Sequence, residues 1–316
     1  MPPSHGLDIA STYVAFGLRI RSRIPLPELG PPIVGEDLPP DVEIRLGKIP
    51  EPTGPPDGVG PALQVFGDAA RLEFPEARYW VKAGSEIVVE PAAGASERDV
   101  RVYLLGSVIG ALCQQRGMLL LHANAIEIDG RAVAFVGPSG AGKSTLAAYF
   151  HLHGRRVLCD DVCRVSIDAD GRALAWSGIP RIKLWRDALD AFRIGEAGLE
   201  RVSDVLDKFS LPTPHDPSPA PLPLTRIYAL GETTECLLSI RGIFGAEAVG
   251  TIMRNTYRPE YSRPLGRSAA QFEKAVGVAK AAGVYAVSRR WGLDVFSTDV
   301  ETILHHVAKL RVDRGS

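Results

Sequence analysis

From Tyr13 to Glu90, short runs of alternating apolar and polar residues are separated by segments rich in proline and glycine. An alternation with period two is typical of half-buried β-strands. We therefore predict a small, mostly antiparallel β domain over residues 1–95, which packs or recognises a partner and carries no catalytic constellation. The runs that predict its strands are Val42–Leu46, Arg71–Phe74, Arg78–Lys82 and Glu86–Val89.

The spacing of apolar residues changes to a helical period after Ser96. The sequence Ser96-Glu97-Arg98-Asp99 resembles a capping box, and Arg116-Gly117 is a suitable helix end. Strands and helices then follow each other over residues 96–316, which predicts an α/β domain. Its first predicted elements are a strand at Met118–Ala123, a hairpin at Ile126–Arg131, a strand at Ala132–Val136, a helix through Leu146–Phe150 and a strand at Arg156–Cys159.

A proline-rich connection over residues 211–224 interrupts this domain, and we interpret it as an extended surface linker. The remaining predicted strands are Ala173–Trp176, Arg226–Leu230, Cys236–Ile240 and Val284–Val287, and the remaining predicted helices are Ala269–Ala282 and Val300–Leu310.

Composition excludes several classes of function. A chain of 316 residues with 36 basic and 37 acidic residues has no basic field for nucleic acid. The longest apolar run, Val102–Cys113, is too short to cross a bilayer, and Met1–Gly6 does not resemble a secretory signal, so we expect a cytoplasmic protein without a membrane partner. The cysteines lack disulfide or zinc spacing, which favours buried core thiols at Cys113, Cys159, Cys163 and Cys236.

The stretch from Gly137 to Thr145 matches the phosphate-binding pattern G-x-x-x-x-G-K-[ST] between a predicted strand and a predicted helix. Glycines let backbone N–H groups converge on phosphate oxygens, and the helix N-terminus adds partial positive charge. Lys143 is placed to reach the β- and γ-phosphates, and Ser144 to ligate Mg²⁺. The predicted nucleotide-binding residues are Gly137, Pro138, Ser139, Gly140, Ala141, Gly142, Lys143, Ser144 and Thr145.

Acidic residues follow the next strand. A crossover connection would bring Asp160 and Asp161 close to Ser144, where one carboxylate can hold Mg²⁺ while the other accepts a proton from an attacking hydroxyl. His122 ends a strand expected beside the strand of the phosphate loop, near the γ-phosphate or Asp160.

Together, His122, the strand–hairpin–strand into Gly137–Ser144, and Gly154–Asp161 resemble the HPr kinase/phosphorylase family. The resemblance implies a core related to phosphoenolpyruvate carboxykinases and the transfer of phosphate from ATP to a protein serine. It implies that Asp160 is the general base, that His122 orients it or the phosphate, and that Ser144 and Asp161 hold Mg²⁺. The family's downstream glutamate-arginine-glycine signature has no glutamate in the matching segment 176–181, so phosphorolysis stays open.

The N-terminal domain, the segment 180–185 and the segment 254–259 resemble a divergent branch, the kinases of lasso-peptide biosynthesis. That resemblance implies a peptide acceptor phosphorylated at its C-terminal serine. Arg181 and Arg254 are the favoured cations for a phosphate or a peptide carboxylate. Further candidate cations are Lys183, Lys208 and Arg258.

The sequence thus predicts an ATP- and Mg²⁺-dependent serine kinase that acts on a peptide or small protein, with a homo-oligomer left open. The alternatives are a small-molecule or carboxykinase-like phosphotransferase, and a nucleotide-binding regulatory module that transfers nothing.

Overall fold

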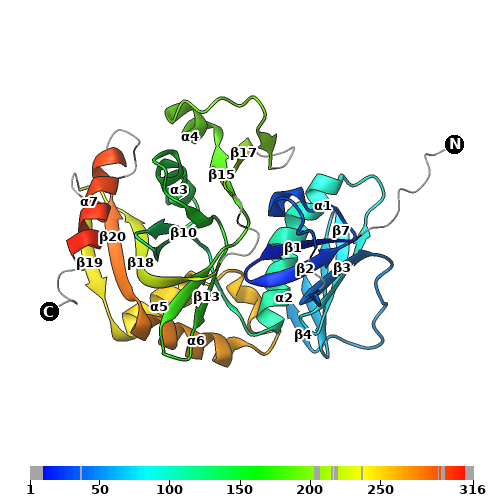
Figure 1. Ribbon diagram of the computed structural model, residues 1–316. Coiled ribbons are helices and arrows are strands. Elements are labelled where there is room, and N and C mark those ends of the chain that lie inside the picture. Colours follow the sequence, from blue (N-terminus) through cyan, green and yellow to red (C-terminus); the bar gives the residue numbers. More distant parts are fainter. Residues whose placement is uncertain are drawn as a thin grey trace.

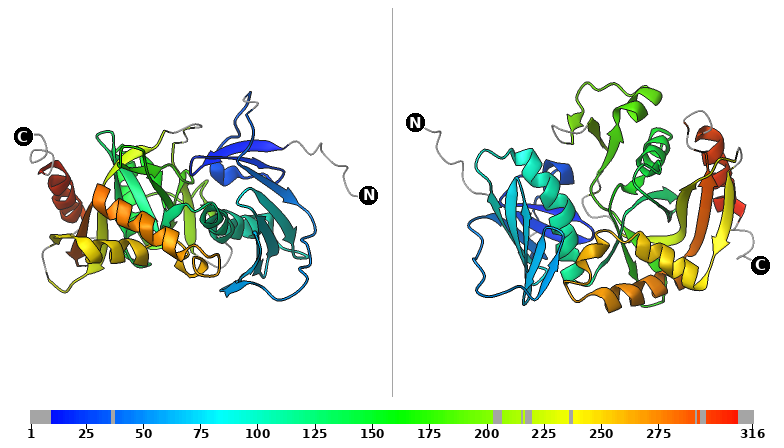
Figure 2. Two further views of the ribbon diagram at one scale, coloured as in Figure 1. Left: turned by 90° about the horizontal axis from the view of Figure 1, so that it is seen from below. Right: turned by 180° about the vertical axis from the view of Figure 1, so that it is seen from behind.

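The computed structural model describes residues 10–35, 38–202, 207–214, 216, 220–235, 238–290, 292 and 296–309. The chain forms an N-terminal β-rich unit and a larger α/β unit, which lie side by side (Figure 1). The same two units are distinct from below and from behind (Figure 2). The α/β class predicted from the sequence is therefore confirmed.

The N-terminal unit contains an eight-stranded sheet with the order β1-β2-β3-β8-β7-β6-β5-β4. Neighbouring strands are antiparallel except at β2–β3 and β3–β8, which pair in parallel, so the sheet is mostly antiparallel. A 3₁₀ turn, η1, covers Pro27–Leu29. The strands are β1 Ser11–Ala15, β2 Leu18–Ser22, β3 Val42–Leu46, β4 Gly58–Gly60, β5 Leu63–Phe66, β6 Ala69–Phe74, β7 Ala77–Lys82 and β8 Glu86–Pro91.

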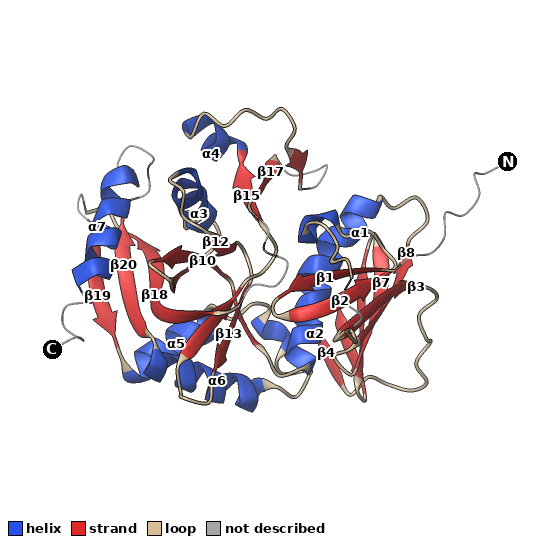
Figure 3. Ribbon diagram, viewed as in Figure 1, coloured by secondary structure: helices blue, strands red, loops and turns tan. Residues whose placement is uncertain are grey.

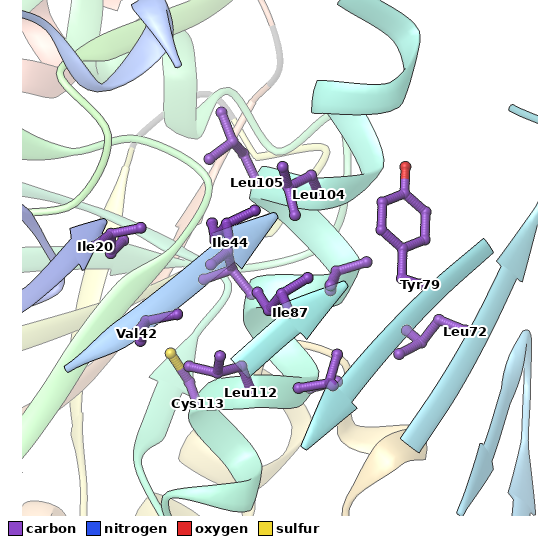
Figure 4. Packing of buried hydrophobic residues seen from close by; sticks show 14 of the residues in the cluster. Ile20, Val42, Ile44, Leu72, Tyr79, Ile87, Leu104, Leu105, Leu112 and Cys113 are labelled. Carbon is purple, nitrogen blue, oxygen red and sulfur yellow. The ribbon is translucent and has the colours of Figure 1, made fainter. Parts of the chain in front are cut away.

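A helical rod follows and packs on this sheet. It consists of α1 (Glu97–Tyr103), a π-helical turn η2 (Leu104–Val108) and α2 (Ile109–Gln115). The predicted cap is present, because the Ser96 hydroxyl accepts a hydrogen bond from the Asp99 N–H. Apolar side chains of the rod and the sheet share one buried cluster (Figure 4). The rod thus belongs by packing to the N-terminal unit, although it lies beyond residue 95.

The α/β unit contains a nine-stranded mixed sheet in which β18 is central, because it pairs in parallel with β11 and β20 and antiparallel with β14. The path through the sheet is β12-β10-β11-β18-β14-β13-β9, and β20 and β19 extend it beside β18. The strands are β9 Leu119–Leu121, β10 Ala123–Ile128, β11 Arg131–Val136, β12 Val157–Cys159, β13 Cys163–Ile167, β14 Ala173–Trp176, β18 Leu222–Glu232, β19 Ser239–Ile243 and β20 Gly283–Arg289.

Helices cover both faces of this sheet (Figure 3). α3 (Lys143–Leu152) and α7 (Phe296–Lys309) share one buried cluster with Val133 and Phe135 of β11. α5 (Gly245–Arg254) and α6 (Ser268–Ala281) share another cluster with Ala132, Ala134 and Val136. Because side chains alternate along a strand, a run that is buried on both faces shows no polar alternation. This accounts for the continuous apolar run of β11. A 3₁₀ turn, η3 (Pro259–Tyr261), lies between α5 and α6.

A smaller, three-stranded sheet lies over α3. Its order is β15-β17-β16, with β15 at Arg181–Trp185, β16 at Glu200–Arg201 and β17 at Lys208–Pro212. The short helix α4 (Arg186–Ala191) follows β15 directly. Apolar residues of this sheet and of α3 belong to the same buried cluster, so the small sheet is fixed over the start of α3.

The strand predicted at Met118–Ala123 is wrong in one respect, because it is divided at His122. The chain leaves the ladder of β9 with β13 and enters the ladder of β10 with β11. At the break, the His122 N–H donates to the carbonyl of Asn255, 2.7 Å away. A residue between two ladders can bond to a third segment, which a continuous strand could not do.

Other predictions shift at their ends. The strand predicted at Cys236–Ile240 starts at Ser239 as β19, and Cys236 lies outside the described residues. The proline-rich connection ends β17 and leads into β18, with residues 215 and 217–219 outside the described part. The predicted end of the last helix, Leu310, is also outside it. No helix in the described part is long and apolar enough to cross a membrane.

Candidate functional site

The glycine-rich loop connects β11 to α3, and its backbone requires glycine at several positions. Gly137, Gly140 and Gly142 have φ angles of 144°, 83° and 76°, which disfavour side chains. At Gly137 a Cβ atom would lie 2.8 Å from the carbonyl oxygen of Leu230 in β18. The loop therefore lies directly against the central strand β18, and α3 begins where the loop ends.

Lys143 is buried and folds back over the loop. Its Nζ donates to the carbonyl oxygens of Gly137 at 2.8 Å and Pro138 at 3.0 Å. Burial lowers the pKa of this amine, and the nearby carboxylates of Asp160 and Asp161 oppose that effect. The ammonium group thus crosses the concave side of the loop, where the phosphates of a nucleotide would lie.

Residues that the sequence did not single out also hold this loop. The buried Asn124 amide donates to the Lys143 carbonyl, and the Arg289 guanidinium donates to the Ala141 carbonyl at 3.2 Å. Arg289 lies 3.5 Å from Asp299 in a buried ion pair. Both residues lie far from the motif in sequence, so no local pattern could have revealed them.

Asp160 follows β12 and lies beside the start of α3. The Ser144 hydroxyl lies 3.0 and 3.1 Å from its carboxylate oxygens, and the Lys183 N–H donates to Oδ2 at 2.9 Å. Burial raises the pKa of Asp160, the charge of Asp161 raises it further, and the two hydrogen bonds oppose this. The positive charge of Lys208 also opposes the rise, so two hydrogen bonds and a nearby cation partly compensate the burial of this carboxylate.

Asp161 points to a different set of partners. Its φ of 79° is in the left-handed region, which is uncommon for a non-glycine residue and is often found at functional sites. Lys183 Nζ donates to its Oδ2 at 2.8 Å, and His122 Nδ1 lies 3.2 Å from its Oδ1. Although burial alone would raise the pKa of Asp161, Lys183 and then His122 hold it well below the ordinary value. Asp161 therefore stays ionised.

The two aspartates were expected to divide their roles, and the contacts do separate them. Lys183 holds one aspartate with its backbone and the other with its side chain. The His122 ring is also fixed, since Nδ1 lies 3.0 Å from the Asp161 carbonyl oxygen as well as near its carboxylate. Both neighbours are acceptors, so Nδ1 carries the proton and Nε2 faces away from Asp161.

A cavity of about 510 Å³ opens above the start of α3. The loop, both aspartates and Lys183 line it, and so do the aromatic side chains of Trp185 and Phe296. Lys208 also lines it, 5.5 Å from the centre of the Trp185 ring, and burial lowers its pKa. The first cavity thus combines cations, a helix N-terminus and aromatic surfaces.

A second cavity of about 780 Å³ lies on the other side of the loop. His122, Ser139 and Asp161 line both cavities, so the two meet at the histidine–aspartate pair. Asp160 and Ser144 line only the first cavity. The far wall of the second is formed by the end of α5 and the segment after it, and includes Arg254, Asn255, Tyr257 and Arg258.

The favoured cations fall in different places. Arg254 lines the second cavity, where its guanidinium donates to the Thr251 hydroxyl at 3.0 Å. Arg181 lines neither of these cavities. It lies near Glu28, beside a separate cavity between the N-terminal unit and the small sheet, and its burial lowers its pKa. The structure therefore does not bring Arg181 to the loop.

The donor set fits magnesium rather than a protein-enclosed metal. Among the described residues, no group of three or more His, Cys, Asp or Glu side chains could hold a metal ion. Mg²⁺ usually binds one or two protein oxygens together with substrate phosphates and waters. Ser144 and Asp160 are oxygen donors in contact and could share one such ion. The cysteines at 113, 159 and 163 are buried, as predicted for core thiols.

No protein-family model and no curated protein matches the chain. Among solved structures, it is similar to the Hpr(Ser) kinase/phosphatase from Coxiella burnetii, with 12% sequence identity over 60% of this chain and 97% of that chain. The TM-score is 0.33, which is too low to establish a shared fold. The contacts of the site therefore carry the functional argument.

Proposed function

We propose that this protein is an ATP- and Mg²⁺-dependent kinase that transfers the γ-phosphate to a serine hydroxyl. The observation that carries this proposal is the contact of Ser144 with Asp160 at the glycine-rich loop, next to the pair of His122 and Asp161. A nucleotide-binding module without transfer activity would need the loop but would have no use for the second pair.

The nucleotide would occupy the first cavity. Backbone N–H groups of the loop and the start of α3 would bind its phosphates, and Lys143 would turn from the loop carbonyls toward the β- and γ-phosphates. Trp185, which is 49% exposed, supplies an aromatic surface on which a base could stack. The burial of Lys143 strengthens its attraction for phosphate, because less water screens the charge.

Ser144 and Asp160 would hold the metal ion. Mg²⁺ bound there would neutralise charge on the phosphates during transfer. The resemblance assigned Asp161 to the metal and Asp160 to the proton, but the contacts favour the opposite assignment. Ser144 touches Asp160, which lines only the first cavity, whereas Asp161 lines both cavities and can reach the second.

Asp161 would accept the proton of the serine hydroxyl, and His122 would orient the carboxylate through Nδ1. The serine oxygen bonds to the γ-phosphorus as the bond between that phosphorus and the β–γ bridging oxygen breaks. The hydroxyl proton passes to the Asp161 carboxylate, and ADP leaves. The lowered pKa keeps Asp161 ionised but also makes it a weak base, so its main task would be to position the hydroxyl by accepting its hydrogen bond.

The acceptor that fits best is a peptide or small protein that presents a serine, and we take the C-terminal serine of a lasso-peptide precursor as the specific case. A cavity of about 780 Å³ is large enough for several residues of a peptide. Arg254 and Arg258 on its wall could attract the terminal carboxylate.

The test uses ATP, Mg²⁺ and short peptides that end in serine, with mass spectrometry to detect added phosphate. A peptide that ends in alanine is the control for the acceptor. Lys143→Ala should weaken ATP binding, and unchanged binding would refute the loop assignment. If no serine, in a peptide or a protein substrate, accepts phosphate from wild-type protein, the kinase proposal fails.

Asp160→Asn and Asp161→Asn separate the two carboxylates. Loss of a metal ligand should raise the Mg²⁺ concentration needed for half-maximal activity. Loss of the proton acceptor should lower kcat by about 10² to 10⁴ at unchanged Mg²⁺ dependence. Asp160→Asn should give the first result and Asp161→Asn the second. The reverse result would restore the assignment that the resemblance implied.

A further inference from the structure

The far wall of the second cavity is bonded directly to the strand break that carries His122. The Asn255 carbonyl accepts from the His122 N–H at 2.7 Å, and the Tyr257 N–H donates to the Leu120 carbonyl at 2.7 Å. Thr256 forms an isolated bridge with Leu121. A shift of this wall would therefore also move His122. The side of the wall that faces away from the cavity packs against the N-terminal unit.

The N-terminal unit supports this wall through Gln114 of α2. The Gln114 side chain is buried, and its amide nitrogen donates to the carbonyls of Tyr257 at 3.2 Å and Arg258 at 2.8 Å. Its amide oxygen accepts from the Ser262 hydroxyl at 3.1 Å. One side chain thus holds Tyr257 and Arg258 of the wall and Ser262, which lies just beyond it.

The same helical rod provides space for the wall. Cβ atoms built at Gly106 and Gly110 would lie 3.3 Å from the Tyr257 hydroxyl and 3.1 Å from its ring, so glycine lets the ring pack against the helix backbone. Burial raises the pKa of Tyr257 to about 12. Arg258 has a φ of 52°, the left-handed conformation that is strained for arginine and must be held by its surroundings.

We propose that the second cavity is the binding site of the acceptor and that Gln114 is a positioning residue that sets its shape. This inference rests on the proposed kinase function. The N-terminal unit then has a defined task, since it holds Tyr257 and Arg258 in a conformation that the segment would not adopt alone.

The charges on this wall favour an acidic group on the acceptor. Arg254 forms no ion pair within the described residues, and Arg258 has Glu260 at 3.5 Å, with the two side chains 41% and 33% exposed. The other two carboxylates at the cavity are also paired, Glu247 with Arg241 at 2.7 Å and Asp161 with Lys183 at 2.8 Å. A carboxylate near the reacting hydroxyl could therefore pair with the guanidinium groups.

The experiment compares Gln114→Leu with Gln271→Leu. Gln271 is also buried and donates to the Met118 carbonyl at 2.8 Å, but it does not touch the wall. The probe is a fluorescein-labelled hexapeptide that ends in serine with a free carboxylate. Its binding is followed by anisotropy, its phosphorylation by mass spectrometry, and nucleotide binding by a fluorescent ATP analogue.

Gln114→Leu should weaken peptide binding and raise the peptide KM about tenfold or more, with nucleotide affinity within about twofold of wild type. Gln271→Leu should change neither. Because Gln114→Leu could fail to fold, Ser262→Ala is included; it removes the hydroxyl donor to Gln114 and should give a smaller shift in the same direction.

The outcomes separate this inference from the kinase proposal. A peptide that binds in a Gln114-dependent way but is never phosphorylated supports the cavity assignment and counts against the kinase proposal. If the Gln114→Leu or the Ser262→Ala variant folds and phosphorylates the peptide with the wild-type KM, only this inference is overturned. The inference is also overturned if both glutamine variants lose nucleotide binding and peptide binding equally, or if the wild-type protein does not bind the peptide.

Discussion

Gly110→Ala tests how closely the N-terminal helix and the cavity wall depend on each other. Gly110 lies inside the continuous rod of α1, η2 and α2, where alanine would normally be favoured. The new methyl group would lie 3.1 and 3.2 Å from Cε1 and Cδ1 of the Tyr257 ring. The ring must therefore move by a few tenths of an ångström, or the helix must.

The expected free energy change follows from two opposing effects. Replacing a helix glycine by alanine gains about 0.5 to 1 kcal/mol. Overpacking a tight contact costs about 1 to 3 kcal/mol when the neighbour cannot yield. Tyr257 is held by its N–H bond to Leu120 and by Gln114 at its carbonyl, so it yields poorly. We expect a net loss of about 0 to 2.5 kcal/mol, with the displaced ring raising the acceptor KM.

Urea denaturation measures the stability change, and phosphate transfer at varied peptide concentration measures KM. The matched control is Gly277→Ala in α6, where the added methyl group would meet the Ile167 side chain at 3.3 Å. Ile167 is 39% exposed and can move aside, so the control should gain about 0.5 to 1 kcal/mol. If Gly110→Ala were as stabilising as the control and left the peptide KM unchanged, the support argument would be refuted.

Lys183→Met should cost more stability at pH 7 than below pH 3.8, the ordinary pKa of an aspartate. The pKa of Asp161 is lowered in the folded protein, so its ion pair stabilises the fold fully above pH 3.8 and progressively less as the pH falls below it. Urea unfolding at both pH values checks this, and equal losses would contradict it. Arg101→Met should destabilise the fold by about 3 to 5 kcal/mol, since it leaves the buried Glu28 carboxylate, 2.9 Å away, without its partner. Denaturation of the double variant with Glu28→Met should show recovery. Gly137→Ala should abolish nucleotide binding in a titration, because its Cβ would meet a backbone oxygen of β18 at 2.8 Å; retained affinity would show that the loop can move.

The glycine-rich loop could be predicted because its signal is local. A glycine pattern, a lysine and a flanking strand and helix all lie within a few residues, and the continuous burial of β11 follows from the same short apolar run. The aspartates at the end of β12 were likewise found from a neighbouring strand. In each case residues that are close together in the sequence determine the local structure.

The sequence predicted that Asp160 and Asp161 divide their roles, but the contacts that separate the two side chains could not be predicted. They depend on the left-handed backbone at Asp161 and on Lys183, which binds one aspartate through its N–H and the other through its amine. Neither feature has a local pattern. Gln114 was equally hidden, because its partners lie more than a hundred residues away, at a sequence separation of 143 or 144.

The central position of β18 has a consequence for how the protein folds. The N-terminal sheet is built from neighbouring segments, so it can form while the chain is still being synthesised. Gly137 of the glycine-rich loop packs against the Leu230 carbonyl in β18. Arg289 donates a hydrogen bond to the Ala141 carbonyl of the same loop, and these two residues are 148 positions apart in the sequence. Such long-range contacts close slowly, because much chain entropy is lost before they form. We therefore expect the glycine-rich loop to be the last part to become ordered, so the proposed nucleotide would stabilise the slowest-forming region of the molecule.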